Sequence, residues 1–151
     1  MPTDQIAVLT QEWERAKMGA GEFLDAMPED KIDFRPSPDV FTFAEQFIHI
    51  GNTNHRFSTA LNPANQPPDA PTGPQTKTAL REYVLAGYDA ILNGLKSLDP
   101  ATLDEEVQFH KWTMSRRVIL MKALEHHAHH RGQTVIYFRI QGLKPPAERL
   151  F

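Results

Sequence analysis

Proline divides this chain into segments, and the division limits what the chain can fold into. The chain has twelve prolines, and all except Pro2 lie at 28–38, 63–74, 100 and 145–146. Because proline lacks an amide hydrogen and its ring clashes with the preceding helical turn, no long helix continues through these points. The remaining stretches are each long enough for several helical turns. The chain is therefore expected to form separate, medium-length helices.

Apolar residues recur in these stretches at steps of three and four, the spacing of one helix face. Thr42 and Glu45, three residues apart, form a capping-box pattern. Gly142 stands where a left-handed C-cap glycine belongs. The predicted helices run from about Thr3 or Asp4, as N-cap, to Met27, from Thr42 to about Leu61, from about Thr78 to Leu98, and from about Met114 to Gln141.

These four helices predict an all-α fold, an antiparallel-type four-helix bundle in a single domain spanning 1–151. The proline-rich stretch 62–77 is interpreted as a polar crossover loop between the second and third helices. Val107, Phe109 and Trp112 suggest a short extended piece before the fourth helix, but no strand pair. No internal repeat is evident.

Composition narrows the function classes. The net charge is −3, so a basic surface for nucleic acid is not expected. The chain has no apolar run long enough to span a membrane and no signal-peptide layout, which indicates a cytoplasmic protein. It contains no cysteine, which excludes disulfides, a cysteine nucleophile and thiolate ligands. A soft-metal site in this chain must therefore use histidine.

Four of the seven histidines fall within "HHAHH", at positions 126–130. On a helix, His126 and His130 lie one turn apart on the same face, at a spacing that lets two imidazoles reach one metal ion. His127 is rotated by about 100° and His129 by about 60°, which disfavours both as ligands. For a third ligand, the predicted second helix offers His49 and His55. His49 is preferred because it lies in the apolar front half of that helix.

Simpler interpretations stand beside this one. A pair of histidines four residues apart also arises by chance, and a histidine-rich helix face is often only solvated. The apolar residues that flank the cluster indicate instead that the fourth helix is central to the bundle, where histidines need partners. His110 is expected to be exposed, and His55 and His127 to be surface or supporting groups. Trp13 and Phe23 are expected in the core, while Arg131 faces solvent, pairs with an acid or meets an anionic substrate.

The chain resembles the DinB/YfiT-like family of metal-binding bundles, which is unrelated to the DNA polymerase of the same name. The resemblance rests on "HIGNTN" after "FTFAEQF", on "HHAHHRGQ" and on the closing "YFRIQGLKPP". It implies His49, His126 and His130 as ligands of a divalent metal, zinc or nickel, and a homodimer. His127 departs from the family pattern, which often has an acid there. Leu124, Ala128 and Val135, roughly opposite the histidine pair, add slight support for a second burial surface.

Three nitrogen ligands leave positions open for chemistry. The sequence lacks the glutamate inside the pair that H-E-x-x-H hydrolases use as a base, although Glu45 or Glu125 could substitute. The resemblance therefore favours a metal- and thiol-dependent S-transferase or related detoxifying enzyme with a small-molecule substrate and a small cellular thiol as cosubstrate. Alternatives are a metal-dependent hydrolase and a non-catalytic, metal-stabilised dimeric stress-response protein. Gln46, Thr53, Gln133 and Tyr137 are expected to line the pocket, and Gln46, Asn52 or Glu125 to accept the second imidazole N–H groups.

Overall fold

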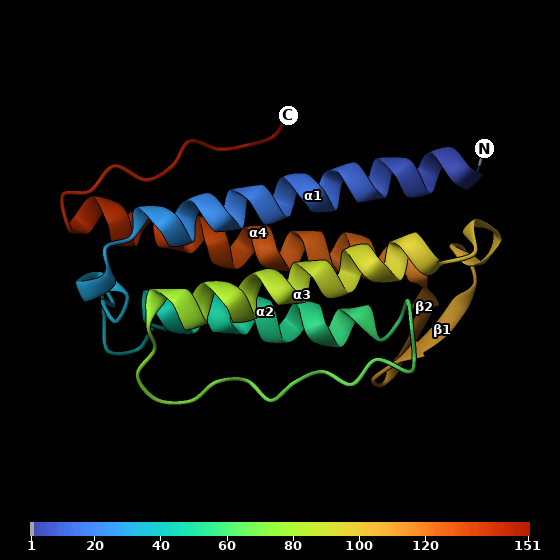
Figure 1. The fold of residues 1–151 in the computed structure, drawn as a ribbon, viewed down its shortest axis with the longest axis horizontal. Helices are drawn as coiled ribbons and strands as arrows, with labels where there is room; N and C mark the ends of the chain where they lie inside the picture. Colours follow the sequence, from blue (N-terminus) through green and yellow to red (C-terminus); the bar gives the residue numbers. More distant parts are fainter. Residues whose placement is uncertain (1) are drawn as a thin grey trace.

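The computed structural model describes residues 2–151 and shows four long helices with a small β-hairpin at one end (Figure 1). The expected all-α four-helix architecture is confirmed. Its elements are α1 (Pro2–Ala26), α2 (Phe43–Ser58), α3 (Lys77–Ser97), β1 (Glu106–Phe109), β2 (Trp112–Ser115) and α4 (Arg116–Ile140), with short 3₁₀ turns at Glu29–Lys31 and Pro100–Thr102.

The direction of the helices differs in one respect from the antiparallel expectation. In Figure 1, α2 and α3 lie side by side and run the same way, while α1 and α4 run opposite to both. Two parallel neighbours require the chain to return along the length of a helix before the second one begins. The proline-rich segment 59–76 makes this return along the outside of the bundle, as a crossover loop.

The helix ends show which local signals were decisive. The Thr42 hydroxyl accepts a hydrogen bond from the Glu45 amide, and the Glu45 carboxylate accepts one from the Thr42 amide, so the capping box is confirmed. Gly142 has φ of +72°, the left-handed conformation expected of a C-cap glycine. The other ends shift by a few residues: α1 includes Thr3 and Asp4 within its first turn, α2 ends at Ser58, and Ser115 caps α4.

A hairpin stands where only an unpaired extended piece was expected. β1 pairs antiparallel with β2 in a register that sets Phe109 opposite Trp112. The turn residue His110 has φ of +52° and is exposed, as expected for that histidine. Two-residue hairpin turns usually have glycine, asparagine or aspartate in this left-handed region. Because this turn position holds a histidine instead, the sequence did not predict the strand pair.

Burial confirms part of the predicted core and corrects the rest. Trp13 and Phe23 are core residues, as expected. His55 and His127 are only 7% and 5% exposed, so of the two expected roles, surface or supporting group, the surface one is wrong for both. His127 turns into the bundle, where its Nδ1 lies 2.9 Å from the Tyr88 hydroxyl. This hydrogen bond offsets the cost of burying the imidazole among the helices.

The fourth helix is less enclosed than the apolar residues near its histidines suggested. Val118, Met121 and Ile136 are 38%, 58% and 55% exposed. One face of α4 therefore carries apolar side chains that the described part of the chain leaves open to solvent. Among residues 2–151, no helix has both the length and the apolar character that crossing a bilayer requires.

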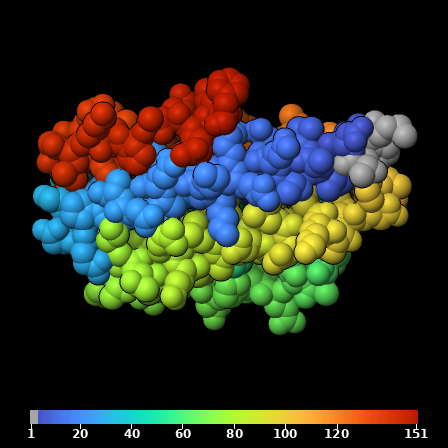
Figure 2. All heavy atoms as spheres, turned by 45° about the horizontal axis from the view of Figure 1, so that its top comes forward, coloured from blue at the N-terminus to red at the C-terminus, as the bar shows by residue number. Residues whose placement is uncertain are grey.

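The last residues of the chain fold back along the first helix. Figure 2 shows the C-terminal segment, in red, lying against α1, in blue. Arg15 donates to the Arg149 carbonyl oxygen at 2.6 Å, and Arg149 pairs with Glu22. Pro145 is buried at the start of this segment. The contacts hold residues 143–151 on the side of the bundle where α1 and α4 meet (Figure 1).

The parallel pair α2 and α3 packs closely enough to require glycine. A Cβ atom on Gly87 would lie 2.8 Å from the carbonyl oxygen of Gly51, a backbone atom that cannot move aside cheaply. We therefore expect Gly87→Ala to lower the free energy of unfolding by about 1–3 kcal/mol, as overpacking does. Urea denaturation measures this change.

Gly21→Ala is the matched control for Gly87→Ala. Gly21 is also a buried glycine inside a helix, but its Cβ would meet only the end of the Arg81 side chain, at 3.6 Å. Helix propensity alone should make this variant neutral or more stable by up to about 1 kcal/mol. Equal losses in the two variants would contradict the proposed close contact.

Candidate metal centre

Three histidines from two helices converge on one point between α2 and α4. His49 projects from α2, and His126 and His130 project from successive turns of α4. The Nε2 atoms of His49 and His126 are 3.0 Å apart, and the His49 ring centroid lies 4.4 Å from that of His130. One ligand nitrogen of each residue lies within 4.8 Å of the others, and all three side chains are half-buried. The structure thus brings together the three residues that the sequence selected.

The surroundings keep these imidazoles neutral. Burial, followed by the charges of neighbouring histidines, lowers the pKa values of His126 and His130 to about 4. Burial also lowers the pKa of His49. At neutral pH each ring therefore offers a nitrogen lone pair, and two of these nitrogens are too close for both rings to carry a proton there. Three neutral imidazole nitrogens form a donor set that fits zinc or nickel.

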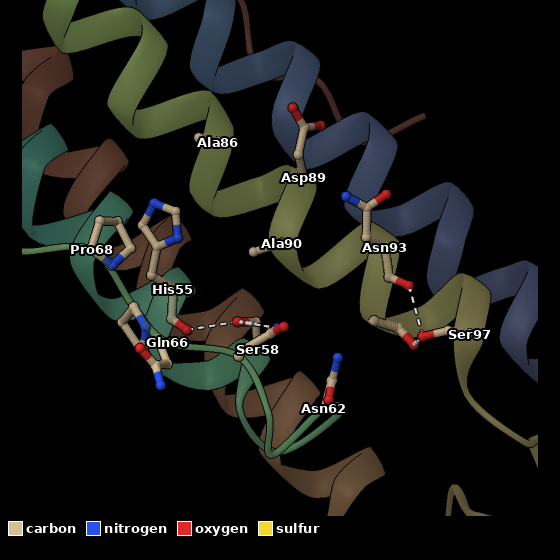
Figure 3. A pocket seen from close by; sticks show the side chains of 13 residues that line it. His55, Ser58, Asn62, Gln66, Pro68, Ala86, Asp89, Ala90, Asn93 and Ser97 are labelled. Carbon is tan, nitrogen blue, oxygen red and sulfur yellow. Dashed lines mark hydrogen bonds between the residues drawn. The ribbon is translucent and has the colours of Figure 1, made fainter.

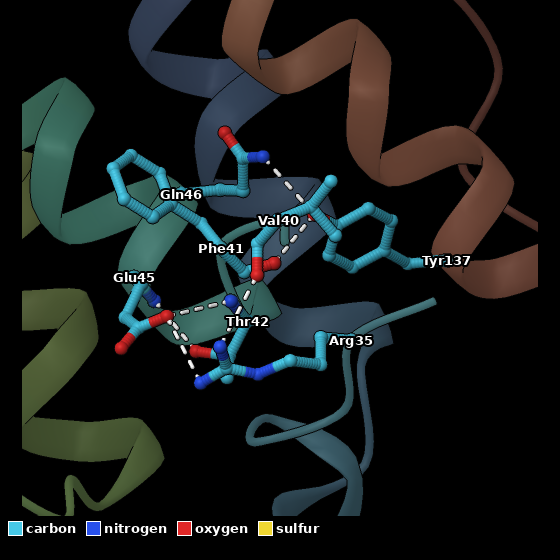
Figure 4. Close-up of polar contacts among 7 residues, drawn as sticks. All are labelled: Arg35, Val40, Phe41, Thr42, Glu45, Gln46 and Tyr137. Carbon is cyan, nitrogen blue, oxygen red and sulfur yellow. Dashed lines mark hydrogen bonds and ion pairs between the residues drawn. The ribbon is translucent and has the colours of Figure 1, made fainter. Parts of the chain in front are cut away.

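A directional chain of hydrogen bonds sets the tautomer of His130. The Tyr137 hydroxyl donates to the Phe41 carbonyl oxygen at 2.5 Å, and a carbonyl can only accept. The Tyr137 oxygen then accepts from Gln46 Nε2 at 3.0 Å, which leaves Gln46 Oε1 to accept from His130 Nδ1 at 2.8 Å. With the proton on Nδ1, His130 presents its Nε2 lone pair to the centre. Figure 4 shows Gln46 and Tyr137 meeting beside Phe41.

The remaining residues expected to line the pocket take different positions. Gln133 accepts the other amide hydrogen of Gln46, at 3.0 Å, so it belongs to the same cluster. The Thr53 hydroxyl donates to the backbone oxygen of His49 at 2.7 Å and is not part of this cluster. Of the expected acceptors for imidazole N–H groups, Gln46 takes this role for His130. Within residues 2–151, His126 Nδ1 is buried without a hydrogen-bond partner.

The other two histidines of "HHAHH" do not point at the centre. His127 faces the core and bonds Tyr88, while His129 is exposed with its ring edge-on to His130 at 4.9 Å. No pattern in the sequence indicated Tyr88 as the partner of His127, because Tyr88 fitted an apolar helix face. Arg131 lies over the Phe23 ring, 5.7 Å from its centroid. It also lowers the pKa of His127, after burial as the main cause.

The carboxylate of Glu45, a candidate base for hydrolysis, already has a hydrogen-bond donor and a cation beside it. Its carboxylate accepts the Thr42 amide at 2.8 Å and lies 3.4 Å from the Arg35 guanidinium (Figure 4). Arg35 precedes α2 by several residues, so the sequence did not indicate this pairing. Glu125, the other candidate, is exposed on α4. These placements weaken the support for a built-in general base.

The Gln46 hydrogen bond leads to a prediction about metal affinity. Gln46→Leu removes the acceptor that orients His130, and groups that orient metal-bound imidazoles typically contribute about 10- to 100-fold in affinity. We expect the variant to bind zinc more weakly by about that factor. Competition with a chromophoric chelator measures the change.

Asn52→Leu is the matched control for Gln46→Leu. Asn52 lies further along the same helix and also carries an amide, but it forms no hydrogen bond to the three histidines among the described residues. Its zinc affinity should stay within about twofold of wild type, a difference well below 1 kcal/mol. Nitrogen NMR shifts of His130 report the tautomer directly, and an unchanged Nδ1–H tautomer in Gln46→Leu would contradict the proposed orientation.

Comparisons with known proteins identify the family and agree with the fold. The model of the DinB superfamily matches residues 12–134, a span that contains all three histidines. The chain is 23% identical over 124 residues to the uncharacterized protein YjoA of Bacillus subtilis, covering 80% of each. Among solved structures, it is similar to a DinB-like protein from Bacillus cereus, with a TM-score of 0.81 and 20% identity over 93% of this chain and 95% of that one.

Two further structures share the fold. The crystal structure of the Bacillus subtilis YjoA protein, described as DinB-like, has a TM-score of 0.73 at 21% identity, covering 95% of both chains. A conserved protein from Enterococcus faecalis has a TM-score of 0.67 at 17% identity, over 86% of this chain and 92% of that chain. At these identities the likeness establishes the architecture that carries the histidines.

Proposed function

Because this chain belongs to the DinB superfamily, we propose that it binds a divalent metal ion, zinc or nickel, through His49, His126 and His130. The observation that carries the proposal is the convergence of three neutral imidazoles, one of them held by Gln46 in the tautomer that a ligand needs. Three nitrogen ligands leave at least one coordination position for another molecule. A metal with an open position is the arrangement of catalytic sites rather than of purely structural ones.

We further propose that the protein is a metal- and thiol-dependent S-transferase or a related detoxifying enzyme of the cytoplasm. A divalent ion bound there would lower the pKa of a thiol and hold it as the nucleophilic thiolate. The thiol would come from solution, because the chain has no cysteine. The engagement of Glu45 with Thr42 and Arg35 supports this class over hydrolysis, which needs a base to activate water.

Aromatic rings beside the centre suit an apolar electrophile as the second substrate. The Phe57 ring lies 6.3 Å from that of His126, and Phe109 of the hairpin stacks on Phe57 at 5.1 Å. The Phe41 ring lies 5.7 Å from His49 on the other side. These rings limit water around the nitrogen cluster and offer apolar contact to a small molecule.

A panel of small thiols offered together with a reactive electrophile tests the proposed activity. Untagged protein is loaded with zinc or nickel, and product is followed by mass spectrometry with and without chelator. Conjugation that requires both metal and thiol supports the S-transferase. Metal-dependent cleavage of esters, amides or lactones without thiol would establish the hydrolase instead, and binding without turnover would leave a non-catalytic stress-response protein.

The exposed apolar face of α4 supports a homodimer. Val118, Met121, Ile136 and Ile140 are 38–58% exposed along one side of this helix, as two apolar pairs with the exposed residues Lys122, Glu125, Ala128 and His129 between them. Apolar side chains aligned on an open helix face commonly mark an interface. We expect the double variant Met121→Glu and Ile136→Glu to sediment as a monomer, because it would bury charges at the contact.

Met18→Glu serves as the control for this double variant in analytical ultracentrifugation. Met18 is 55% exposed on α1, so the same substitution adds charge outside the proposed interface. The wild type and this control should sediment alike as dimers. A wild type that sediments as a monomer at all concentrations tested would contradict the dimer.

A further inference from the structure

A second polar cavity lies away from the three histidines, between α2, α3 and the start of the crossover loop (Figure 3). It encloses about 560 Å³, within the range of about 300–1,000 Å³ typical of small-molecule sites. His55 and Ser58 of α2 form its buried end, and Asn65 of the loop closes one side. None of the metal-centre residues lines it.

The wall that α3 contributes has a regular pattern. Ala86 and Ala90 lie four residues apart and form a smooth strip without large side chains, and Gly94, one turn further on, is covered by the Leu61 side chain. The polar residues Asp89, Asn93 and Ser97 repeat at the same spacing beside them. Residues four apart stack along one helix face, so the cavity has a flat, small-residue floor flanked by a row of hydrogen-bonding groups. Figure 3 shows Ala86 and Ala90 turned toward His55, while the side chains of Asp89 and Asn93 lie at the rim and project toward the α1 side.

His55 is a buried residue whose ring lies beside that of Tyr83, with centroids 5.3 Å apart. It is 7% exposed, and its Nε2 atom has no hydrogen-bond partner among residues 2–151. Its ring stands beside Pro68, across from Ala86 and Ala90, in Figure 3. A buried ring nitrogen without a partner is costly, so a histidine kept in this position indicates a hydrogen bond that the chain itself does not supply.

The charges at the cavity favour a neutral ligand. Of the described residues that line it, Asp89 is the one carboxylate, and it already pairs with Lys17 of α1 at 2.6 Å. Burial lowers the pKa of His55, so its ring is neutral at pH 7. The other polar groups are amides and the hydroxyls of Ser58 and Ser97, which donate to backbone oxygens and keep acceptor capacity for a ligand. Such a lining complements hydroxyl groups, which both donate and accept hydrogen bonds, and attracts ions of neither sign.

We propose that this cavity binds a neutral, polyhydroxylated ring of the size of a monosaccharide or cyclic polyol. The Ala86–Ala90 strip contacts the flat carbon face of the ring, and the amide of Asn93 at the rim bonds its outer hydroxyls. His55 bonds one further hydroxyl at the buried end. The site is independent of the metal centre and is present with or without a metal ion.

NMR of the histidine side chains in the full-length protein tests the proposal. The probes are D-glucose, myo-inositol and N-acetyl-D-glucosamine, with glucose 6-phosphate as the anionic comparison. We expect at least one neutral probe to shift the His55 resonances in a saturable manner while those of His49, His126 and His130 stay unchanged. Failure of all three neutral probes to shift His55, or tighter binding of glucose 6-phosphate than of every neutral probe, would overturn it.

Two variants locate the binding at this cavity. Ala90→Leu fills the floor and should weaken the binding of the best neutral probe by at least about tenfold, and Asn93→Leu should do the same by removing an amide. Ala79→Leu, an exposed alanine on the same helix outside the cavity, should leave the affinity unchanged. Circular dichroism verifies that each variant is folded. Unaltered affinity in folded Ala90→Leu and Asn93→Leu would also overturn the proposal.

Discussion

Replacing either His126 or His130 with alanine is expected to abolish measurable binding of zinc or nickel. Each substitution removes one of three nitrogen ligands and leaves the other two too few to hold the ion against water. Since even the groups that orient a ligand are worth about 10- to 100-fold, losing the ligand itself should cost more than about 100-fold in affinity. Isothermal titration of metal-free protein, with competition by a chelator, measures the loss.

His129→Ala is the matched control for these ligand variants. It lies between them on α4, is exposed, and is not one of the three residues whose nitrogens converge. Its affinity should stay close to that of wild type. If His129→Ala or His127→Ala abolished binding while His130→Ala did not, the helix face assigned to the metal would be wrong.

The metal-free protein is expected to lose at least about 3 kcal/mol of unfolding free energy between about pH 7 and about pH 4.5. The pKa values of His126 and His130 are about 4 and that of His127 about 3 in the folded protein, against 6.5 for an ordinary histidine. Between these two pH values the three histidines bind protons in the unfolded chain but stay neutral in the folded chain. Stability therefore falls as the pH drops from about 6.5 towards about 4, and these groups leave it constant above pH 7.

Burial is the main cause of all three lowered pKa values. The neighbouring charges that add to it are His49 and His129 for the ligand pair and Arg131 and Arg15 for His127. His127→Gln keeps a hydrogen-bonding group near Tyr88 but does not titrate, so it should lose roughly a third of the pH dependence. Urea denaturation at both pH values measures this. A wild type with the same stability at both would contradict the burial of neutral histidines.

Local signals in the sequence anticipated most of the helical frame. Proline placed the breaks, and the Thr42–Glu45 capping box and Gly142 act through neighbours only a few residues away. Interactions of this range depend little on the rest of the fold. The hairpin was not predicted, because the turn residue His110 has a left-handed backbone conformation that is uncommon for histidine.

Helix geometry was also sufficient to select two of the candidate metal ligands. A spacing of four residues puts His126 and His130 on one face in any helix, whatever surrounds it. The choice of His49 over His55 rested on the apolar neighbours of His49, and the structure places His49 at the cluster and His55 at a separate cavity. The same reasoning did not predict which residues of α4 are exposed, because apolar neighbours in the sequence do not show which face of the helix another helix covers.

The sequence by itself therefore determined the number of helices, their approximate ends and the two histidines that share a face, because each depends on contacts within a few residues. Only the tertiary structure decided that α2 runs parallel to α3 and that Gln46 holds His130. It also decided that Glu45 is bound to Arg35 and that His127 meets Tyr88. These pairings join side chains from separate segments, and they form only when packing of the apolar faces sets the distance and rotation between those segments.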